Sequence, residues 1–118
     1  MTDGRNKSLC YHFKLQSGLQ MPNMLQFIKI NGQVFAFSYG YLYLWQLANK
    51  EKLVISYGNE RIEIKGFNLD ALCPHLSNHT LLWLREVKLG SEAVDKQMQR
   101  TDVLITSIEY LVNGTPSR

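Results

Sequence analysis

Short apolar runs separated by tight-turn residues fill most of residues 25–87. The first two runs are residues 25–30 and 34–39, and Asn31-Gly32 lies between them. An Asn-Gly pair in this position favours a hairpin with a two-residue type I′ turn, because both central residues of that turn have positive φ. The pattern therefore predicts a β-rich chain that begins with a hairpin.

Three further strands follow the hairpin in the predicted order, over residues 41–47, 53–57 and 60–65. In the last of them Ile62 and Ile64 are expected to point inward. The strand at 41–47 is apolar on both faces, whereas a sheet with one face in water alternates apolar and polar residues. Both faces of that strand are therefore expected to be covered.

One short helix is expected next, with Asn68 as its N-cap. Four residues with helical spacing give it one apolar face: Leu69, Leu72, Cys73 and Leu76. Pro74 cannot continue a helix interior. The helix is therefore expected to be distorted or restarted at Pro74 and to end near Asn78.

The C-terminal third is less clearly patterned. A strand over residues 81–87 would have Leu82 and Leu84 on one face and the remaining apolar residues on the other, namely Leu81, Trp83 and Val87. Residues 91–99 fit either a loop or a helix. The β-branched residues of 103–112 favour a strand, although a set with helical spacing also runs through this region: Val94, Met98, Ile105, Ile108 and Val112.

Together these elements predict an α+β fold with one short helix. Its sheet is expected to be curved, mainly antiparallel and partly barrel-like, with a meander over the first four strands. Residues 1–24 are expected to form a flexible or loosely attached leader, whose later part could be an edge strand. Residues 25–112 then form a single β-rich domain, and residues 113–118 a disordered tail.

The composition is that of a globular protein with few charges. The chain has 118 residues, of which 45% are hydrophobic and 19% are charged. The low charged fraction suggests that a second subunit covers some apolar surface. Residues 1–7 are polar and no h-region follows them, and no segment is apolar enough to span a bilayer. A cytoplasmic protein without membrane association is therefore expected, with Cys10 and Cys73 as reduced thiols.

The formal net charge of +3 is concentrated near the start of the chain. Residues 1–33 hold four basic residues and only one acidic residue, Asp3; the basic ones are Arg5, Lys7, Lys14 and Lys29. A nucleic-acid-binding protein more usually gathers its basic residues on one face of the fold. Nucleic acid is therefore kept as an alternative partner and is not the favoured one.

Cysteine and histidine occur twice as a Cys-x-His pair, in Cys10-Tyr11-His12 and Cys73-Pro74-His75, and His79 lies close to the second pair. Two such pairs could form a tetrahedral zinc site, but the spacing is not that of a standard finger. Cys73 with His12 or His79 could also act as a nucleophile pair. No G-x-S-x-G, P-loop or dinucleotide motif is present. We therefore expect no cofactor and no enzymatic activity, with a small Cys/His metal protein or enzyme as the lowest alternative.

The aromatic residues Tyr41, Tyr43 and Trp45 recur at every second position. On one strand face they could form a stacking platform for nucleic-acid bases, or they could lie in a subunit interface, where tyrosine and tryptophan are enriched. No lysine or arginine lies between Val34 and Leu47 to meet phosphates. The pattern therefore favours an interface.

The order of elements resembles small bacterial domains that have no assigned activity. It runs from an apolar hairpin through Tyr39-Gly40-Tyr41-Leu42 and a second hairpin to a Gly-x-Asn-Leu helix start and a strand that contains Trp83. This resemblance supplies no functional residues. The predicted function is a non-enzymatic protein-interaction or oligomerisation module. Its partner is expected to be a second copy of the chain, in a homo-oligomer such as a dimer, or another protein.

Overall fold

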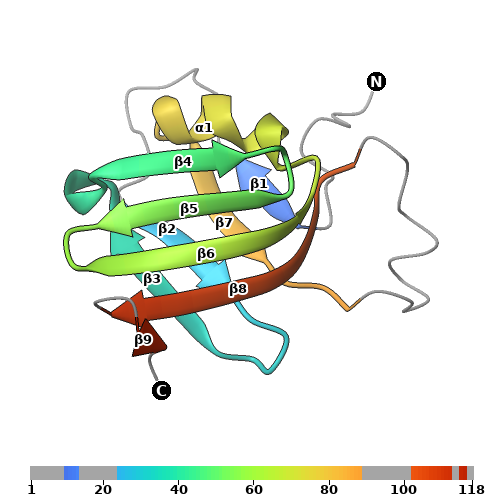
Figure 1. Ribbon diagram of the computed structural model, residues 1–118, viewed down its shortest axis with the longest axis horizontal. Helices are drawn as coiled ribbons and strands as arrows, with labels where there is room; N and C mark the ends of the chain where they lie inside the picture. Colours follow the sequence, from blue (N-terminus) through green and yellow to red (C-terminus); the bar gives the residue numbers. More distant parts are fainter. Residues whose placement is uncertain (1–9, 14–23, 89–101, 113–114, 117–118) are drawn as a thin grey trace.

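The computed structural model describes residues 10–13, 24–88, 102–112 and 115–116, which form two facing sheets and a short helical segment (Figure 1). The four-stranded sheet has the order β1-β7-β2-β3, with the bounds β1 Tyr11–Phe13, β7 Leu81–Arg85, β2 Met24–Ile28 and β3 Val34–Ser38. The five-stranded sheet has the order β4-β5-β6-β8-β9, with the bounds β4 Leu44–Ala48, β5 Lys52–Tyr57, β6 Glu60–Phe67, β8 Leu104–Val112 and β9 Thr115–Pro116.

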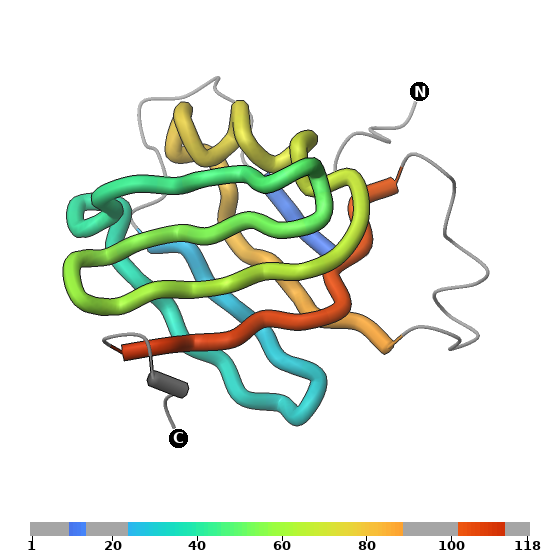
Figure 2. The backbone as a smooth tube through the Cα atoms, viewed as in Figure 1, coloured from blue at the N-terminus to red at the C-terminus, as the bar shows by residue number. Residues whose placement is uncertain are grey.

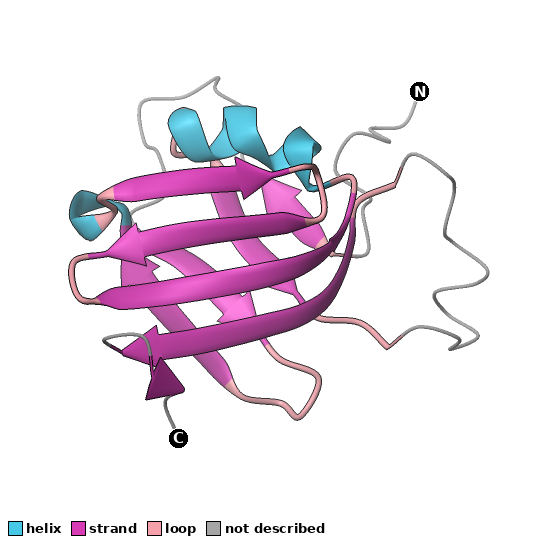
Figure 3. Cartoon of the chain, viewed as in Figure 1, coloured by secondary structure: helices cyan, strands magenta, loops and turns pink. Residues whose placement is uncertain are grey.

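The predicted α+β class is confirmed, with curved and mainly antiparallel sheets and one short α-helix (Figure 3). The described strands do not close into a barrel. The predicted meander holds for β4, β5 and β6, but it is wrong at the preceding junction, because β3 pairs with β2 and not with β4. A 3₁₀ helix, η2 (Tyr39–Tyr41), carries the chain from one sheet to the other at this point.

The first hairpin is confirmed, but its turn is longer than predicted. The Lys29 N–H donates to the Gln33 carbonyl at 2.8 Å, and the Gly32 N–H donates to the Lys29 carbonyl at 3.0 Å. Gly32 has a φ of +92°, whereas Asn31 is not among the residues with positive φ. This is a three-residue loop that ends on a left-handed glycine. Asn31 Oδ1 accepts the Gln33 N–H at 2.9 Å, so the asparagine stabilises the loop through its side chain.

The core lies between the two sheets. Ile62 and Ile64 of β6 are buried as predicted, and Leu53 and Ile55 of β5 are buried beside them. The two-residue turn between these strands is also confirmed, with Gly58 at a φ of +67°.

Aromatic rings of β3 pack against rings of the other sheet. Phe35 of β3 stacks on Tyr110 of β8 with ring centroids 5.2 Å apart, and Phe37 stacks on Tyr57 at 4.4 Å. β3 therefore contacts the five-stranded sheet through stacked rings and not through strand pairing.

The helical segment forms in two pieces, as Pro74 predicts. The 3₁₀ helix η3 (Leu69–Leu72) leads into α1 (Cys73–Ser77), which has Pro74 in its first turn and Asn78 as C-cap. The apolar face is confirmed, with Leu69, Leu72 and Leu76 buried. Figure 2 shows this segment along the upper edge of the sheets.

Asn68 is the N-cap residue of η3, as predicted, but its side chain makes no cap hydrogen bond. Asn68 has a left-handed backbone with a φ of +58°, and its Nδ2 donates to the Asp102 carbonyl at 2.9 Å. Its amide therefore joins the start of the helical segment to the start of β8.

The predicted faces of β7 need a correction. Leu81 and Leu84 are both fully buried, although simple alternation places them on opposite faces. The reason is an irregularity in the pairing with β1, where His12 faces Trp83 and Phe13 faces Leu81. Leu82 is skipped in this register, so the alternation shifts by one residue.

The strand predicted over residues 103–112 is confirmed as β8. The alternatives for residues 91–99 lie outside the described part of the chain. The division into leader, domain and tail stays a prediction, because residues 1–9, 14–23, 113–114 and 117–118 also lie outside it. The described part of the tail, Thr115–Pro116, pairs with β8.

Cys10 is not in a loosely organised segment, as the sequence suggested, but fully buried. Its Sγ accepts the Ile105 N–H at 3.3 Å, and Phe13 of β1 also lies in the core. This short stretch is held by pairing with β7, the central strand next to it. Residues 10–13 therefore contribute to the core.

Candidate interaction surface

Strand β4 is the end strand of the five-stranded sheet. Among the described strands it pairs only with β5. Natural proteins commonly protect such an edge with a lysine, a proline or a bulge, because unpaired backbone groups are a template for another strand. Residues 34–49 contain no charged residue and no proline, and the pairing of β4 with β5 has no register shift. The edge therefore lacks these three features, although the helical segment of η3 and α1 runs beside it (Figure 1).

Large aromatic side chains are exposed directly before this edge. Tyr41 and Tyr43 are 76% and 78% exposed, and Leu44 is 43% exposed. Trp45 is half-buried and packs against the core. The strand begins at Leu44 rather than at Tyr41, which belongs to η2, so the three predicted interface residues do not share one continuous strand face.

The prediction that both faces of β4 are covered is wrong for a single chain, because one face is exposed. Trp45 and Leu47 are half-buried against the core, whereas Leu44, Gln46 and Ala48 are exposed on the outer face. The outer face of β4 is therefore open to a partner.

The turn that presents Tyr41 is fixed by local hydrogen bonds and by the buried Tyr39. Ser38 Oγ accepts the Gly40 N–H at 3.1 Å, and the Leu42 N–H donates to the Tyr39 carbonyl at 3.1 Å. Tyr39 is buried and its hydroxyl donates to the Leu81 carbonyl at 2.8 Å. Burial raises the pKa of Tyr39 well above its ordinary value, so this hydroxyl stays a donor. An anchored Tyr39 leaves Tyr41 in a defined outward position.

The three histidines pack on three different aromatic rings. His12 stacks on Trp83 at 5.9 Å between centroids, His75 on Phe13 at 4.1 Å, and His79 on Tyr39 at 4.6 Å. Within the described residues no group of three or more His, Cys, Asp or Glu side chains could hold a metal ion.

Both cysteines are free thiols, one buried and one half-buried. Burial raises the pKa of the Cys10 thiol, and it also raises the pKa of the Cys73 thiol. A raised pKa keeps a thiol protonated, whereas a nucleophilic cysteine needs the thiolate.

The basic residues considered for nucleic-acid binding are only partly described, because Lys7 and Lys14 lie outside the described ranges. Lys29 is described, and its Nζ donates to the Ile108 carbonyl at 2.8 Å. This ammonium group is thus used in joining the two sheets.

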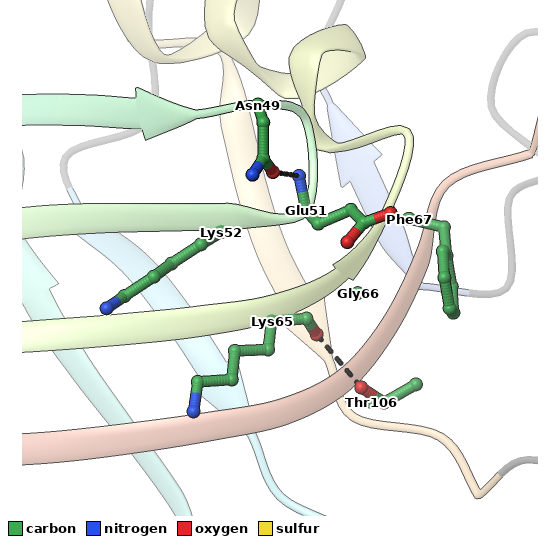
Figure 4. A pocket seen from close by; sticks show the side chains of 7 residues that line it. All are labelled: Asn49, Glu51, Lys52, Lys65, Gly66, Phe67 and Thr106. Carbon is green, nitrogen blue, oxygen red and sulfur yellow. Dashed lines mark hydrogen bonds between the residues drawn. The ribbon is translucent and has the colours of Figure 1, made fainter.

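Two surface features were not predicted from the sequence. Met24 and Val34 are apolar residues at opposite ends of the first hairpin, and they are 44% and 54% exposed. An open pocket also lies beside the turn between β4 and β5 (Figure 4). The cross-strand register of β5 and β6 was the available signal for the pocket, because it places Lys52 opposite Lys65.

Comparison with known proteins gives no match: no family model, no curated protein and no solved structure corresponds to the chain. None of the described helices is long and apolar enough to cross a membrane.

Proposed function

We propose that this protein is a non-enzymatic homo-oligomerisation module in which two copies pair through strand β4. The observation that carries the proposal is the edge of β4, which has no charged residue, proline or bulge and pairs with no described strand but β5, next to the exposed side chains of Tyr41 and Tyr43. Exposed apolar side chains beside an uncharged edge strand are typical of protein–protein contact sites.

A second copy fits this edge better than a charged partner does. Two antiparallel β4 strands related by a two-fold axis would satisfy each other's backbone groups and continue the sheet across the dimer. An edge without charges offers a charged partner no salt bridge, whereas two copies of this edge can pair without repulsion between like charges. The tyrosines of the two copies would then lie on either side of the paired strands.

The size of this interface can be estimated from the aromatic residues. A tyrosine buries about 150–250 Å² when it is covered. Four tyrosines from two copies would therefore bury about 600–1,000 Å² before the strands themselves are counted. Such an area lies below the roughly 1,200 Å² at which specific stable interfaces begin, in the range of weak or transient contacts. The dimer is therefore expected to dissociate on dilution.

The nucleic-acid alternative has less support from the described residues, since Lys29 is hydrogen-bonded to the Ile108 carbonyl. It keeps its own signature, which is binding that weakens steeply as salt is raised.

The test is sedimentation velocity of the wild-type protein and of two lysine variants over a series of concentrations. Tyr43→Lys places a charge at the proposed interface and should weaken the dimer by at least about tenfold. It removes the Tyr43 ring of each copy from the contact and adds one positive charge to each copy. Val34→Lys is the matched control, since it places the same charge at an exposed apolar residue of the other sheet.

A wild-type chain that is monomeric at all concentrations would overturn the proposal. Dissociation by Val34→Lys but not by Tyr43→Lys would move the interface to the first hairpin and would equally contradict pairing through β4. Circular dichroism of each variant shows whether the fold is intact.

A further inference from the structure

An open pocket of about 320 Å³ lies on the outer side of the five-stranded sheet, where the turn after β4 meets the end of β6 (Figure 4). Its lining combines two lysines, one carboxylate, one exposed aromatic ring and small polar groups, from residues Asn49, Glu51, Lys52, Lys65, Gly66, Phe67 and Thr106. The inference drawn from this pocket does not depend on pairing through β4.

The pocket is built by a turn and a bulge that hold each other in place. Asn49 and Lys50 have positive φ values of 51° and 79°, and the Gly66 N–H donates to the Glu51 carbonyl at 3.0 Å. The pairing of β6 with β8 shifts between Lys65 and Gly66, and Thr106 is the residue skipped on β8. Bulges of this kind redirect side chains and are frequent next to binding sites.

One end of the pocket carries an unfavourable pair of positive charges. Lys52 and Lys65 are direct cross-strand neighbours, and like charges in this position repel each other. Lys52 is 3.9 Å from Glu63, an ion pair at the limit of the usual distance. In Figure 4 both lysine side chains extend in the same direction, away from Phe67. An anionic group between the two ammonium groups would relieve their repulsion.

The other end of the pocket offers an aromatic surface and a hydrogen-bond acceptor. Phe67 is 42% exposed although it is fully apolar. The Glu51 carboxylate extends toward Phe67 and away from the two ammonium groups (Figure 4). A flat ring on Phe67 could therefore donate a hydrogen bond to Glu51. Thr106 Oγ1 donates to the Lys65 carbonyl at 3.2 Å, which leaves its lone pairs free to accept.

We propose that this pocket binds a small ligand that combines an anionic group, a flat ring and an amino donor, as an adenine mononucleotide does. The phosphate lies between Lys52 and Lys65, the base stacks on Phe67, and the amino group of the base donates to Glu51. Lysine is a common phosphate ligand, and bases stack on exposed aromatic side chains. A volume of about 320 Å³ lies within the range of small-molecule sites.

The test is a titration of the full-length protein with adenosine monophosphate, followed by two-dimensional amide NMR spectra. Saturable shifts are expected at Gly66, Phe67 and Thr106, with a dissociation constant below about 10 mM. Lys65→Gln and Phe67→Ala should each weaken binding by about fivefold or more, because one removes a phosphate contact and the other the stacking surface.

Arg61→Gln is the matched control. Arg61 is also an exposed cation on β6 but does not line the pocket, so its loss should change the affinity by less than about twofold. Equal weakening by Arg61→Gln and Lys65→Gln would mean general charge attraction and would overturn the inference. So would the absence of saturable shifts up to about 10 mM.

Three further probes test the parts of the ligand. Inorganic phosphate and adenosine should each bind more weakly than adenosine monophosphate, and inosine monophosphate should bind more weakly because it lacks the amino donor. If inorganic phosphate binds as tightly as the nucleotide, the ring and the donor contribute nothing and the proposed ligand class is wrong.

Discussion

The Glu86 carboxylate joins the two sheets through two backbone groups. Its Oε1 accepts the Ile30 N–H at 2.9 Å, and its Oε2 accepts the Ile108 N–H at 2.6 Å. Ile30 lies in the loop after β2, whereas Ile108 lies in β8 of the other sheet. Lys29 contacts the same residue of β8 through the Ile108 carbonyl. The variant Glu86→Ala removes both carboxylate bonds at once.

The expected loss of stability follows from the surroundings of the two bonds. Ile30 is exposed, so water replaces the lost acceptor and the cost there is about 0.5 kcal/mol. Ile108 is a core residue whose bond to Glu86 is partly buried, and its N–H loses a charged acceptor at a cost of about 1.5–3 kcal/mol. Glu86→Ala should therefore lower the free energy of unfolding by about 2–4 kcal/mol. That is a large part of the roughly 5–15 kcal/mol that stabilises a typical domain.

Urea unfolding followed by tryptophan fluorescence measures this loss. The measurement is made at several protein concentrations, because self-association would add to the apparent stability. Glu109→Ala is the matched control: Glu109 is the exposed carboxylate next to Ile108, and its removal should change the stability by less than about 0.5 kcal/mol. Glu86→Gln should lie between the control and Glu86→Ala, because its amide keeps one acceptor oxygen. If the free energy of unfolding of Glu86→Ala lies within about 0.5 kcal/mol of the wild-type value, the carboxylate does not join the sheets.

Three other variants or measurements test the fold. Gly66→Ala should prevent folding or lower the melting temperature by more than about 8 °C in a thermal melt. The reason is that a Cβ at Gly66 would overlap the Leu104 carbonyl oxygen and lie 2.8 Å from the carbonyl carbon. A melting temperature equal to that of the wild type would contradict the close approach of the strands. Burial lowers the pKa of His75 below its ordinary value of 6.5, so the folded chain binds this proton less readily than the unfolded chain. The stability contributed by neutral His75 is therefore complete above pH 6.5 and is lost as the pH falls below that value. When the pH is lowered from about 8 to 5, the urea midpoint should decrease less in His75→Gln than in the wild type. An equal decrease in both proteins would refute this assignment. A thiol reagent should modify half-buried Cys73 at least about tenfold faster than buried Cys10 in the native protein, as peptide mass mapping would show; equal rates would contradict the burial of Cys10.

The strands could be predicted where side-chain pattern and turn chemistry agree. Ile62 and Ile64 alternate with charged neighbours, and Gly58 supplies the positive φ that a two-residue hairpin turn needs. Pro74 correctly indicated that the helical segment restarts there. These features depend on residues that are close in the sequence, so one sequence is enough to find them.

The assignment of strands to two sheets could not be predicted in this way. Whether β3 pairs with β4 depends on the direction in which η2 carries the chain. Tyr39 of η2 is held by a hydrogen bond from its hydroxyl to the Leu81 carbonyl, far along the sequence. The burial of Cys10 depends equally on a distant contact, with Ile105 of β8. Local pattern does not encode such long-range contacts.

The candidate interface was found in part. The absence of charge around Tyr41, Tyr43 and Trp45 is a property of the sequence. That β4 ends a sheet, and that Trp45 turns toward the core while the tyrosines are exposed, are properties of the tertiary structure. The pocket beside Lys52 and Lys65 needed the bulge at Gly66 as well as the strand register.

The most direct test of pairing through β4 is hydrogen–deuterium exchange at the backbone amides over a range of protein concentrations. Pairing of two β4 strands would protect amides of residues 44–48 increasingly as the concentration rises, while β3, the end strand of the other sheet, would exchange at a constant rate. Exchange at residues 44–48 that does not depend on concentration, or protection that grows only at β3, would contradict the proposed function.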